Sequence, residues 1–132
     1  MVKALDIALT GLNAQSNKLS ATASNVANIR TSGSLEEGKQ APYTPLTTQQ
    51  TTQTDGSVRS SIVDRANPFA QGYDPDSPLA DENGIIGIPN IDINEEMTNL
   101  AKAQNGYESN IAVIKTSIEM SDTLLNAIDE EA

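Results

Sequence analysis

Residues able to carry out chemistry are scarce in this chain. It contains no His and no Cys, so the usual general base, the thiolate nucleophile and the commonest metal ligand are all missing. Eighteen Asp and Glu residues remain, and paired carboxylates can perform acid–base catalysis. They lie mainly in an expected helix and in a Pro-rich stretch, where solvated carboxylates are the ordinary case. We therefore expect no enzymatic activity and no catalytic residues.

The acidic stretch from Asp81 to Gly84 has the nearest resemblance to a metal-binding motif. If Gly84 takes the sixth position of a calcium-binding loop, Leu79 and Asn90 take the first and twelfth, where acidic ligands are required. The stretch therefore predicts a tight turn that leads into a hairpin at Ile85. Glycine-rich phosphate loops are missing too, so we expect no metal and no cofactor.

Charge and hydropathy exclude two further classes of function. The net charge is -10, with eight basic residues against eighteen acidic ones, and this balance does not suit nucleic acid or an anionic membrane surface. No stretch reaches the roughly 18 apolar residues of a membrane span, so we expect no direct membrane insertion. The N-terminus lacks a basic segment followed by an apolar one, so we expect no cleavable signal peptide.

Composition divides the chain into three parts. We expect an N-terminal helix over 1–30, a Pro/Thr/Gln-rich middle segment with short strands or a hairpin over 31–91, and a long C-terminal helix over 92–132. The middle segment holds all six prolines and a Thr/Gln tract over 44–54, which cannot bury enough apolar surface to order itself alone. Alternating Val58, Ser60 and Ile62 predict one short strand.

Apolar residues at helical spacing predict both terminal helices. Asp92 and Glu95 indicate a helix cap. Two series carry the pattern: Leu5, Leu12, Leu19 and Val26 in the first helix, and Ile93, Met97, Leu100, Gln104, Tyr107, Ile111, Ile114, Ile118, Ser121, Leu125 and Ile128 in the last. The second series follows a heptad pattern, which favours a coiled-coil seam. We therefore expect a mainly α chain whose long terminal helices pack as a coiled coil, with a small β-containing or extended middle segment.

Charge differs between the two expected helices. Residues 1–30 hold three basic residues and one acid, a net +2, whereas 92–132 hold two basic residues and nine acids, a net -7. We infer that the helices pair with each other, within one chain or between neighbours. Exposed charge pairs contribute only about 0–1 kcal/mol each, so they would select the register while apolar contacts supply the stability.

Two polar pairs on these helices allow a local and a functional interpretation. Asn25 and Asn28 lie near the end of the first helix, where side-chain capping of backbone groups is the local interpretation. Tyr107 and Asn110 lie within one turn of the last helix, where a core Tyr beside a partly buried amide is the local interpretation. Spacing alone favours the local interpretation of both pairs.

The same residues carry a family resemblance. The run Ala23-Ser24-Asn25-Val26-Ala27-Asn28, with Thr31 and Gly33 after it, resembles the N-terminal signature of flagellar rod and hook proteins. Ala103, Tyr107 and Asn110 are similar to the C-terminal signature, and the stretch from Tyr73 to Met97 resembles the proximal-rod members. The chain departs from the family at Thr47–Thr54, where an apolar strand is usual, and at Gly106 in the last helix.

The resemblance implies a structural role in the bacterial flagellum. Such a subunit would polymerise through its terminal helices into the proximal rod of the basal body, which transmits torque. Its implied partners are copies of itself, other rod proteins, the inner-membrane ring junction and the flagellar type III export apparatus, which exports subunits without a cleavable signal. The alternative is a soluble helical-hairpin adaptor or secretion chaperone, which would fold alone.

We predict that the contacts between subunits use the helix seams. The predicted interface residues are Leu5, Leu12, Leu19, Asn25, Val26, Asn28, Met97, Leu100, Tyr107, Asn110, Ile111, Ile114, Ile118 and Leu125.

Overall fold

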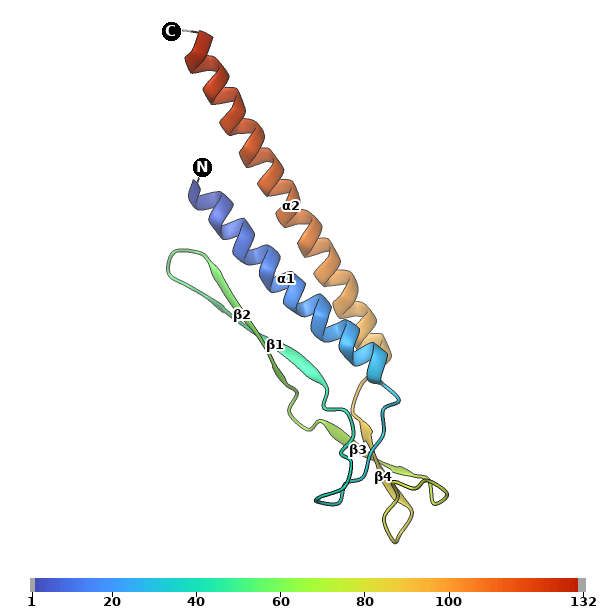
Figure 1. Cartoon of the computed structure of the whole chain (residues 1–132). Helices are drawn as coiled ribbons and strands as arrows, with labels where there is room; N and C mark the ends of the chain where they lie inside the picture. Colours follow the sequence, from blue (N-terminus) through green and yellow to red (C-terminus); the bar gives the residue numbers. More distant parts are fainter. Residues whose placement is uncertain (1, 131–132) are drawn as a thin grey trace.

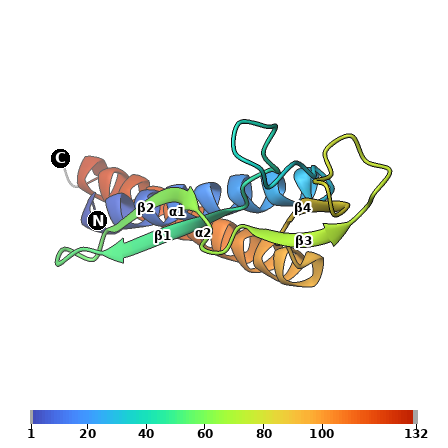
Figure 2. The ribbon, with the colours of Figure 1, turned by 90° about the horizontal axis from the view of Figure 1, so that it is seen from below.

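The chain folds into two antiparallel helices with two β-hairpins beside and below them (Figure 1). The computed structural model describes residues 2–130. In chain order the elements are α1 (Val2–Asn28), β1 (Leu46–Thr52), β2 (Val58–Asp64), β3 (Phe69–Tyr73), β4 (Ile85–Pro89) and α2 (Ile93–Glu130). Figure 2 shows the two hairpins following one another along the long axis of the molecule. Helix α1 lies between α2 and the β1–β2 hairpin.

The prediction of a mainly α chain is wrong. Helices of 27 and 38 residues are accompanied by two antiparallel two-stranded sheets, β1–β2 and β3–β4. The Thr/Gln tract, expected to be unable to order alone, forms β1 and pairs along its whole length with β2, from Leu46 opposite Asp64 to Thr52 opposite Val58. Thr is β-branched and favours extended backbone, and α1 supplies the surface that a lone hairpin lacks. The strand predicted around Val58, Ser60 and Ile62 is confirmed as β2.

The coiled-coil seam of large apolar residues is also wrong. The four apolar residues of the α1 heptad series are only half-buried, while the buried side chains of α1 are Ala8, Ala14, Ala21, Thr22 and Asn25. A Cβ at Gly11 would lie 2.7 Å from Asn110 Oδ1, and one at Gly106 would lie 2.8 Å from Gln15 Cδ. The helices therefore approach closely through small residues, and periodicity alone does not distinguish such a contact from a leucine seam.

Charge does not set the register of the helix pair. Within residues 2–130 the ion pairs are Lys39–Glu36, on a loop, and Arg65–Glu96, between the middle segment and α2. Neither joins α1 to α2. The two helices lie closest at the glycines at 11 and 106, each opposite a polar side chain of the other helix.

The helix ends follow the predicted capping residues. Asp92 Oδ1 accepts hydrogen bonds from the Asn94 and Glu95 amides at 2.8 and 3.3 Å, so the predicted N-cap of α2 is confirmed. At the end of α1, Asn28 Nδ2 donates to the Ser24 carbonyl at 2.9 Å, which is the local interpretation of Asn28. Met1, Glu131 and Ala132, which the predicted terminal segments included, lie outside the described residues.

The second hairpin is joined to the end of α1 by a pair of glycines. Gly33 and Gly87 exchange two backbone hydrogen bonds of 2.9 and 2.8 Å, an isolated antiparallel bridge. A Cβ at Gly33 would lie 2.2 Å from the Pro42 nitrogen, so the approach requires glycine. The tight turn predicted at Gly84 is confirmed, because this residue has φ of 76° and its amide donates to the Asp81 carbonyl at 3.0 Å.

Replacement of Gly33 by Ala should destabilise the fold by about 1–3 kcal/mol or more, since the backbone of residues 40–42 must move. Gly106→Ala is the control: the added methyl group meets the movable end of Gln15 and gains about 1 kcal/mol of helix propensity. Urea unfolding followed by circular dichroism measures both variants. Equal stabilities for the two variants would contradict this account of the Gly33–Gly87 bridge.

The turn before β4 should depend on pH. Asp81 Oδ1 accepts hydrogen bonds from the Ile85 and Asn83 amides, both at 2.8 Å, and the bond from Ile85 is the main cause that lowers the pKa of the Asp81 carboxyl. A lowered pKa means that the contribution to stability is present above the ordinary Asp range and is lost as pH falls through the lowered value. Amide exchange at Ile85, followed by NMR during acidification, should accelerate there. Asp81→Asn should remove this acid dependence.

Candidate assembly site

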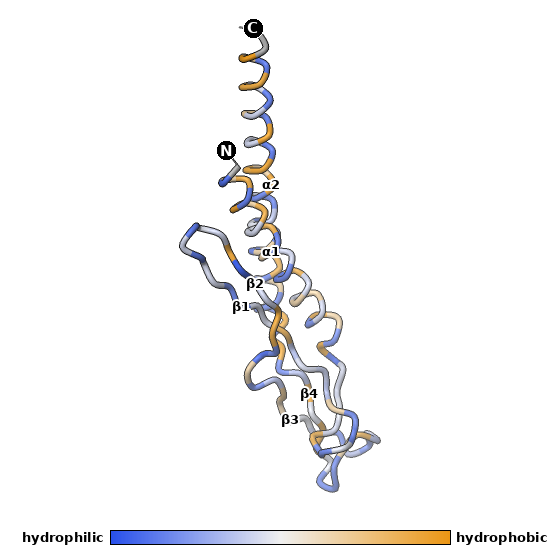
Figure 3. The backbone as a smooth tube through the Cα atoms, turned by 60° about the vertical axis from the view of Figure 1, so that its left-hand side comes forward, coloured by the Kyte–Doolittle hydropathy of each residue, from blue (hydrophilic) through white to orange (hydrophobic). Residues whose placement is uncertain are grey.

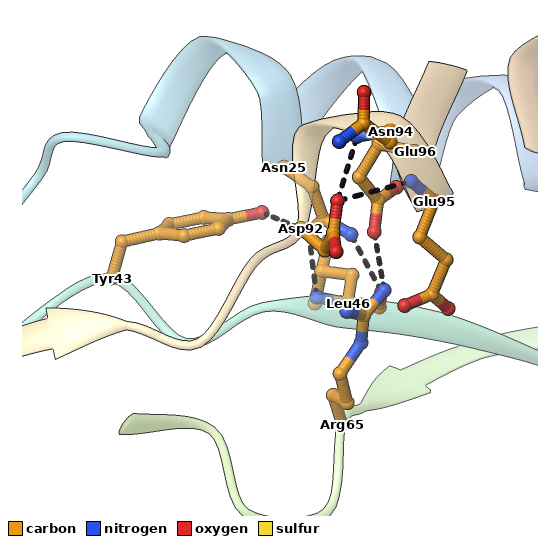
Figure 4. A network of polar contacts seen from close by, with 8 residues as sticks. All are labelled: Asn25, Tyr43, Leu46, Arg65, Asp92, Asn94, Glu95 and Glu96. Carbon is orange, nitrogen blue, oxygen red and sulfur yellow. Dashed lines mark hydrogen bonds and ion pairs between the residues drawn. The ribbon is translucent and has the colours of Figure 1, made fainter. Parts of the chain in front are cut away.

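The β1–β2 hairpin is held to α1 by side chains that bond to its backbone. Asn25, only 1% exposed, donates from Nδ2 to the Leu46 carbonyl at 2.9 Å and accepts from the Leu46 amide at 2.8 Å through Oδ1. The Tyr43 hydroxyl donates to the same oxygen at 3.1 Å (Figure 4). The amide side chain thus takes the place of a neighbouring strand at the start of β1.

Two more α1 side chains bond to the other strand of this hairpin. Thr10 Oγ1 accepts from the Val58 amide at 3.0 Å, and Asn17 Nδ2 donates to the Ser60 carbonyl at 3.3 Å. Analysis of the sequence missed Thr10 and Asn17. The available signal was their spacing, because Thr10, Asn17 and Asn25 follow one another at seven and eight residues, which keeps them near one face of a helix.

A buried ion pair completes the joint between the hairpin and α2. Glu96 lies in the first turns of α2 and is 1% exposed, and its carboxylate pairs with the guanidinium of Arg65, just after β2 (Figure 4). The Arg65 amide donates to the Pro45 carbonyl at 2.7 Å and extends the β1–β2 ladder. We call Asn25, Tyr43, Leu46, Arg65 and Glu96 the polar joint. A buried carboxylate is costly without its partner, so the joint requires the hairpin and both helices together.

Helix α2 continues past the end of α1. Gly11 lies opposite Asn110, and Gln15 lies opposite Gly106. In both pairs the two residue numbers add up to 121. Val2, the first residue of α1, therefore lies opposite about residue 119 of α2. The last turns of α2 therefore have no intrachain helix beside them, as Figure 1 shows. Figure 3 shows apolar residues recurring along this free end.

The free end of α2 continues the face that packs on α1. One seven-residue row consists of Glu96, Ala103, Asn110, Ser117 and Leu124, and the first two members are buried. Leu124, beyond α1, is 49% exposed. We call the exposed apolar residues of this end the overhang patch: Ile118, Met120, Leu124, Leu125 and Ile128. The face thus changes from small and polar side chains to large apolar ones where α1 ends.

The structure distributes the predicted interface residues over three environments. Asn25 is buried in the polar joint, and Met97, Ile118 and Leu125 are exposed. The remaining ten are half-buried along the helices: Leu5, Leu12, Leu19, Val26, Asn28, Leu100, Tyr107, Asn110, Ile111 and Ile114. The structure brings Asn110 against Gly11. Contacts between subunits remain a prediction for these side chains.

Comparison with known proteins identifies the class of protein to which this chain is similar. A family model described as "Flagella basal body rod protein" matches residues 5–33, which include most of α1. A second, described as "Flagellar basal body rod FlgEFG protein C-terminal", matches residues 82–127, which include most of α2. The sequences of both helices are therefore similar to segments of flagellar rod proteins.

Curated relatives narrow the class further. The flagellar basal-body rod protein FlgC of Yersinia enterocolitica is 34% identical over 121 residues, which cover 89% of this chain and 90% of the relative. FlgC of Buchnera aphidicola subsp. Acyrthosiphon pisum is 34% identical over 126 residues, which cover 91% of this chain and 92% of the relative. FlgC of Agrobacterium fabrum is 32% identical over 130 residues, covering 93% and 89%. The chain belongs to the FlgC family of flagellar basal-body rod proteins.

Family membership confirms the structural role inferred from the motifs at Asn25 and Tyr107. The chain is a structural subunit of the flagellar basal-body rod and serves motility, and its relatives are structural rod proteins. It assembles with other rod proteins in the basal body. The alternative of an adaptor or chaperone is set aside. Within residues 2–130 no helix is long and apolar enough to cross a bilayer.

Replacement of Arg65 tests how much the polar joint contributes to the stability of the subunit. Arg65→Met leaves Glu96 buried without a partner and should cost about 3 kcal/mol. The double variant Arg65→Met/Glu96→Leu removes both charges and should be more stable than Arg65→Met alone. Urea unfolding of the two variants measures the difference.

Lys39→Met is the matched control, because it breaks the exposed Lys39–Glu36 pair and should cost less than about 1 kcal/mol. If Arg65→Met and Lys39→Met were equally stable, the buried pair would not hold the joint together.

Proposed function

We propose that this chain is a subunit of the proximal part of the rod, that it polymerises head to tail through its helices, and that it has no enzymatic activity. The observation that carries the proposal is the overhang patch, in which Met120, Leu124 and Ile128 continue the α1-packing face of α2 beyond the end of α1. A helix of a neighbouring subunit, placed end to end with α1, would cover it. Burial of five large apolar side chains offers roughly 1.5–3 kcal/mol each before entropy losses.

Head-to-tail contact explains an open-ended assembly. The patch on α2 and the helix that covers it are different surfaces, so the contact is heterologous and extends into a filament unless rotation closes it into a ring. The charges suit this arrangement. Glu119 and Asp122 lie on the α2 face opposite to Leu124, so covering the patch buries neither carboxylate. We propose α1 of a second copy, or of a related rod protein, as the covering helix.

The same proposal applies to the residues that the sequence predicts to lie between subunits. The exposed Met97, Ile118 and Leu125 and the half-buried members of the predicted set would complete the contacts between helices of neighbouring subunits, while Asn25 would hold the subunit in shape. We further propose that the subunit reaches the rod through the flagellar type III export apparatus, without a cleavable signal, and that the rod joins the inner-membrane ring and transmits torque across the periplasm.

Charges placed in the overhang patch should prevent rod assembly. Leu124→Asp/Leu125→Asp puts two unpaired carboxylates where a neighbouring helix would pack, and burying them would cost several kcal/mol. The variant replaces the resident FlgC relative in a motile host. We expect soluble subunit, non-motile cells and no rod beyond this stage in purified basal bodies.

Lys115→Gln/Asn126→Asp is the matched control, since it changes the net charge by the same two units at exposed positions on the face of α2 opposite to Leu124. It should leave motility intact. Normal motility of the Leu124→Asp/Leu125→Asp variant would refute assembly through the patch.

A further inference from the structure

Each hairpin has one strand edge covered by the rest of the chain and one edge left open. In β1–β2, the bonds from Arg65 to Pro45 and from Gln53 to Ser57 show which residues face the partner strand. Odd-numbered residues of β1 bond to β2, so the backbone groups of even-numbered ones point outward. Leu46 is satisfied by Asn25. The outward edge of β2 is bonded at Val58 and Ser60 by α1.

Three outward residues of β1 remain: Thr48, Gln50 and Thr52. Their outward amide and carbonyl groups have no hydrogen-bond partner within residues 2–130. No charged residue occurs between Thr44 and Thr54. Soluble proteins usually protect a free edge with Lys, Pro or a bulge; β1 contains no Lys and no Pro, and its register with β2 is continuous.

The second hairpin shows the same asymmetry. Bonds from Asn90 to Pro68 and from Asp74 to Gly84 place even-numbered residues of β3 toward β4. The outward edge of β4 is bonded by Gly33 and by Asp81. On β3, the outward backbone groups belong to Phe69, Gln71 and Tyr73, and these also lack partners among the described residues. No charged residue occurs from Ala66 to Tyr73.

We propose that the open edge of β1 pairs antiparallel with the open edge of β3 from a second copy of this chain. Both edges offer three outward residues at two-residue spacing, so Thr48, Gln50 and Thr52 can face Tyr73, Gln71 and Phe69 respectively, with two hydrogen bonds exchanged at each pair. Both edges are uncharged, so no charge has to be buried. Tyr73, 74% exposed in the single chain, would gain a cross-strand neighbour.

A second copy is the occupant that this geometry favours. Pairing β1 with β1 of another copy requires a two-fold axis and closes a dimer, whereas β1 with β3 joins two different surfaces and leaves one open edge of each kind for the next subunit. This pairing rests on the proposed head-to-tail assembly and adds a backbone contact to the helix contact at the overhang patch.

Disulfide trapping in basal bodies tests the pairing, because the native chain has no Cys. One copy carries Gln50→Cys and a co-expressed copy carries Gln71→Cys. Opposed residues that exchange both bonds lie about 5.5 Å apart at Cα, within the range for a disulfide. We expect a 50–71 cross-linked dimer after mild oxidation. Gln49→Cys with Gln71→Cys is the control and should not cross-link, since the side chain of residue 49 points to the other face of β1.

The outcomes separate this pairing from the proposed function. Motile cells with intact rods and no 50–71 cross-link would overturn the edge pairing and leave helix-driven assembly standing. Cross-linking of Gln50→Cys copies with each other alone would overturn it as well, since that product reports a two-fold contact.

Proline scanning provides a second measurement if the cysteine variants do not assemble. Gln50→Pro removes an outward amide and spares the β1–β2 ladder, so the subunit should keep its helical and strand content by circular dichroism while rods are lost. Gln50→Ala retains the amide and should build rods. Normal rods with Gln50→Pro, or loss of rods with Gln50→Ala, would overturn backbone pairing at this edge.

Discussion

Helix α1 packs against α2 on one side and against the β1–β2 hairpin on another, and the rest of the structure depends on these two contacts. Toward α2 it presents Gly11, which allows the helix backbones to approach closely. Toward the β1–β2 hairpin it presents polar side chains that bond to strand backbone. A chain with 3% aromatic residues has few large anchors, so close approach and backbone hydrogen bonds replace the usual thick apolar core.

The polar joint makes these two contacts interdependent. Asn25 is placed by α1, Arg65 by the end of the hairpin and Glu96 by α2, so the hairpin forms one set of buried polar contacts with each helix. Buried polar groups cost free energy when they are unpaired. Partial folding of one element is therefore penalised, and the helices and the hairpin are expected to order together. Residues near the sequence motif at 23–28 thus serve the subunit's own architecture.

Local signals in the sequence predicted the helix ends and the turns. Asp92 and Gly84 act through their own side chain or backbone, which short-range rules describe well. The leucine seam failed because periodicity reports which face of a helix is apolar and not which neighbour covers it. Leu5 and Leu12 have the right spacing, yet the backbones meet at Gly11. The β1 strand was missed because its order depends on α1, which is distant in sequence.

The family motif was more informative than composition for the candidate site, but it did not reveal what Asn25 does. Its partners Leu46 and Tyr43 lie 21 and 18 residues away, and no single-sequence rule connects them. The sequence analysis did not single out Glu96 as a site residue, because its burial against Arg65 depends on where the hairpin lies. The overhang patch could not be foreseen either, because it appears only when the register of the two helices is known.

The attachment of the hairpin to α1 has a mechanical consequence. Thr10, Asn17 and Asn25 bond to the hairpin at points spread over roughly 22 Å of helix. A force directed along the helix axis would stretch these three attachments at the same time, whereas a force pulling the hairpin tip sideways would open them one after another. The subunit is therefore stiffer along its length than across it, and sliding of the hairpin along α1 requires several bonds to break together.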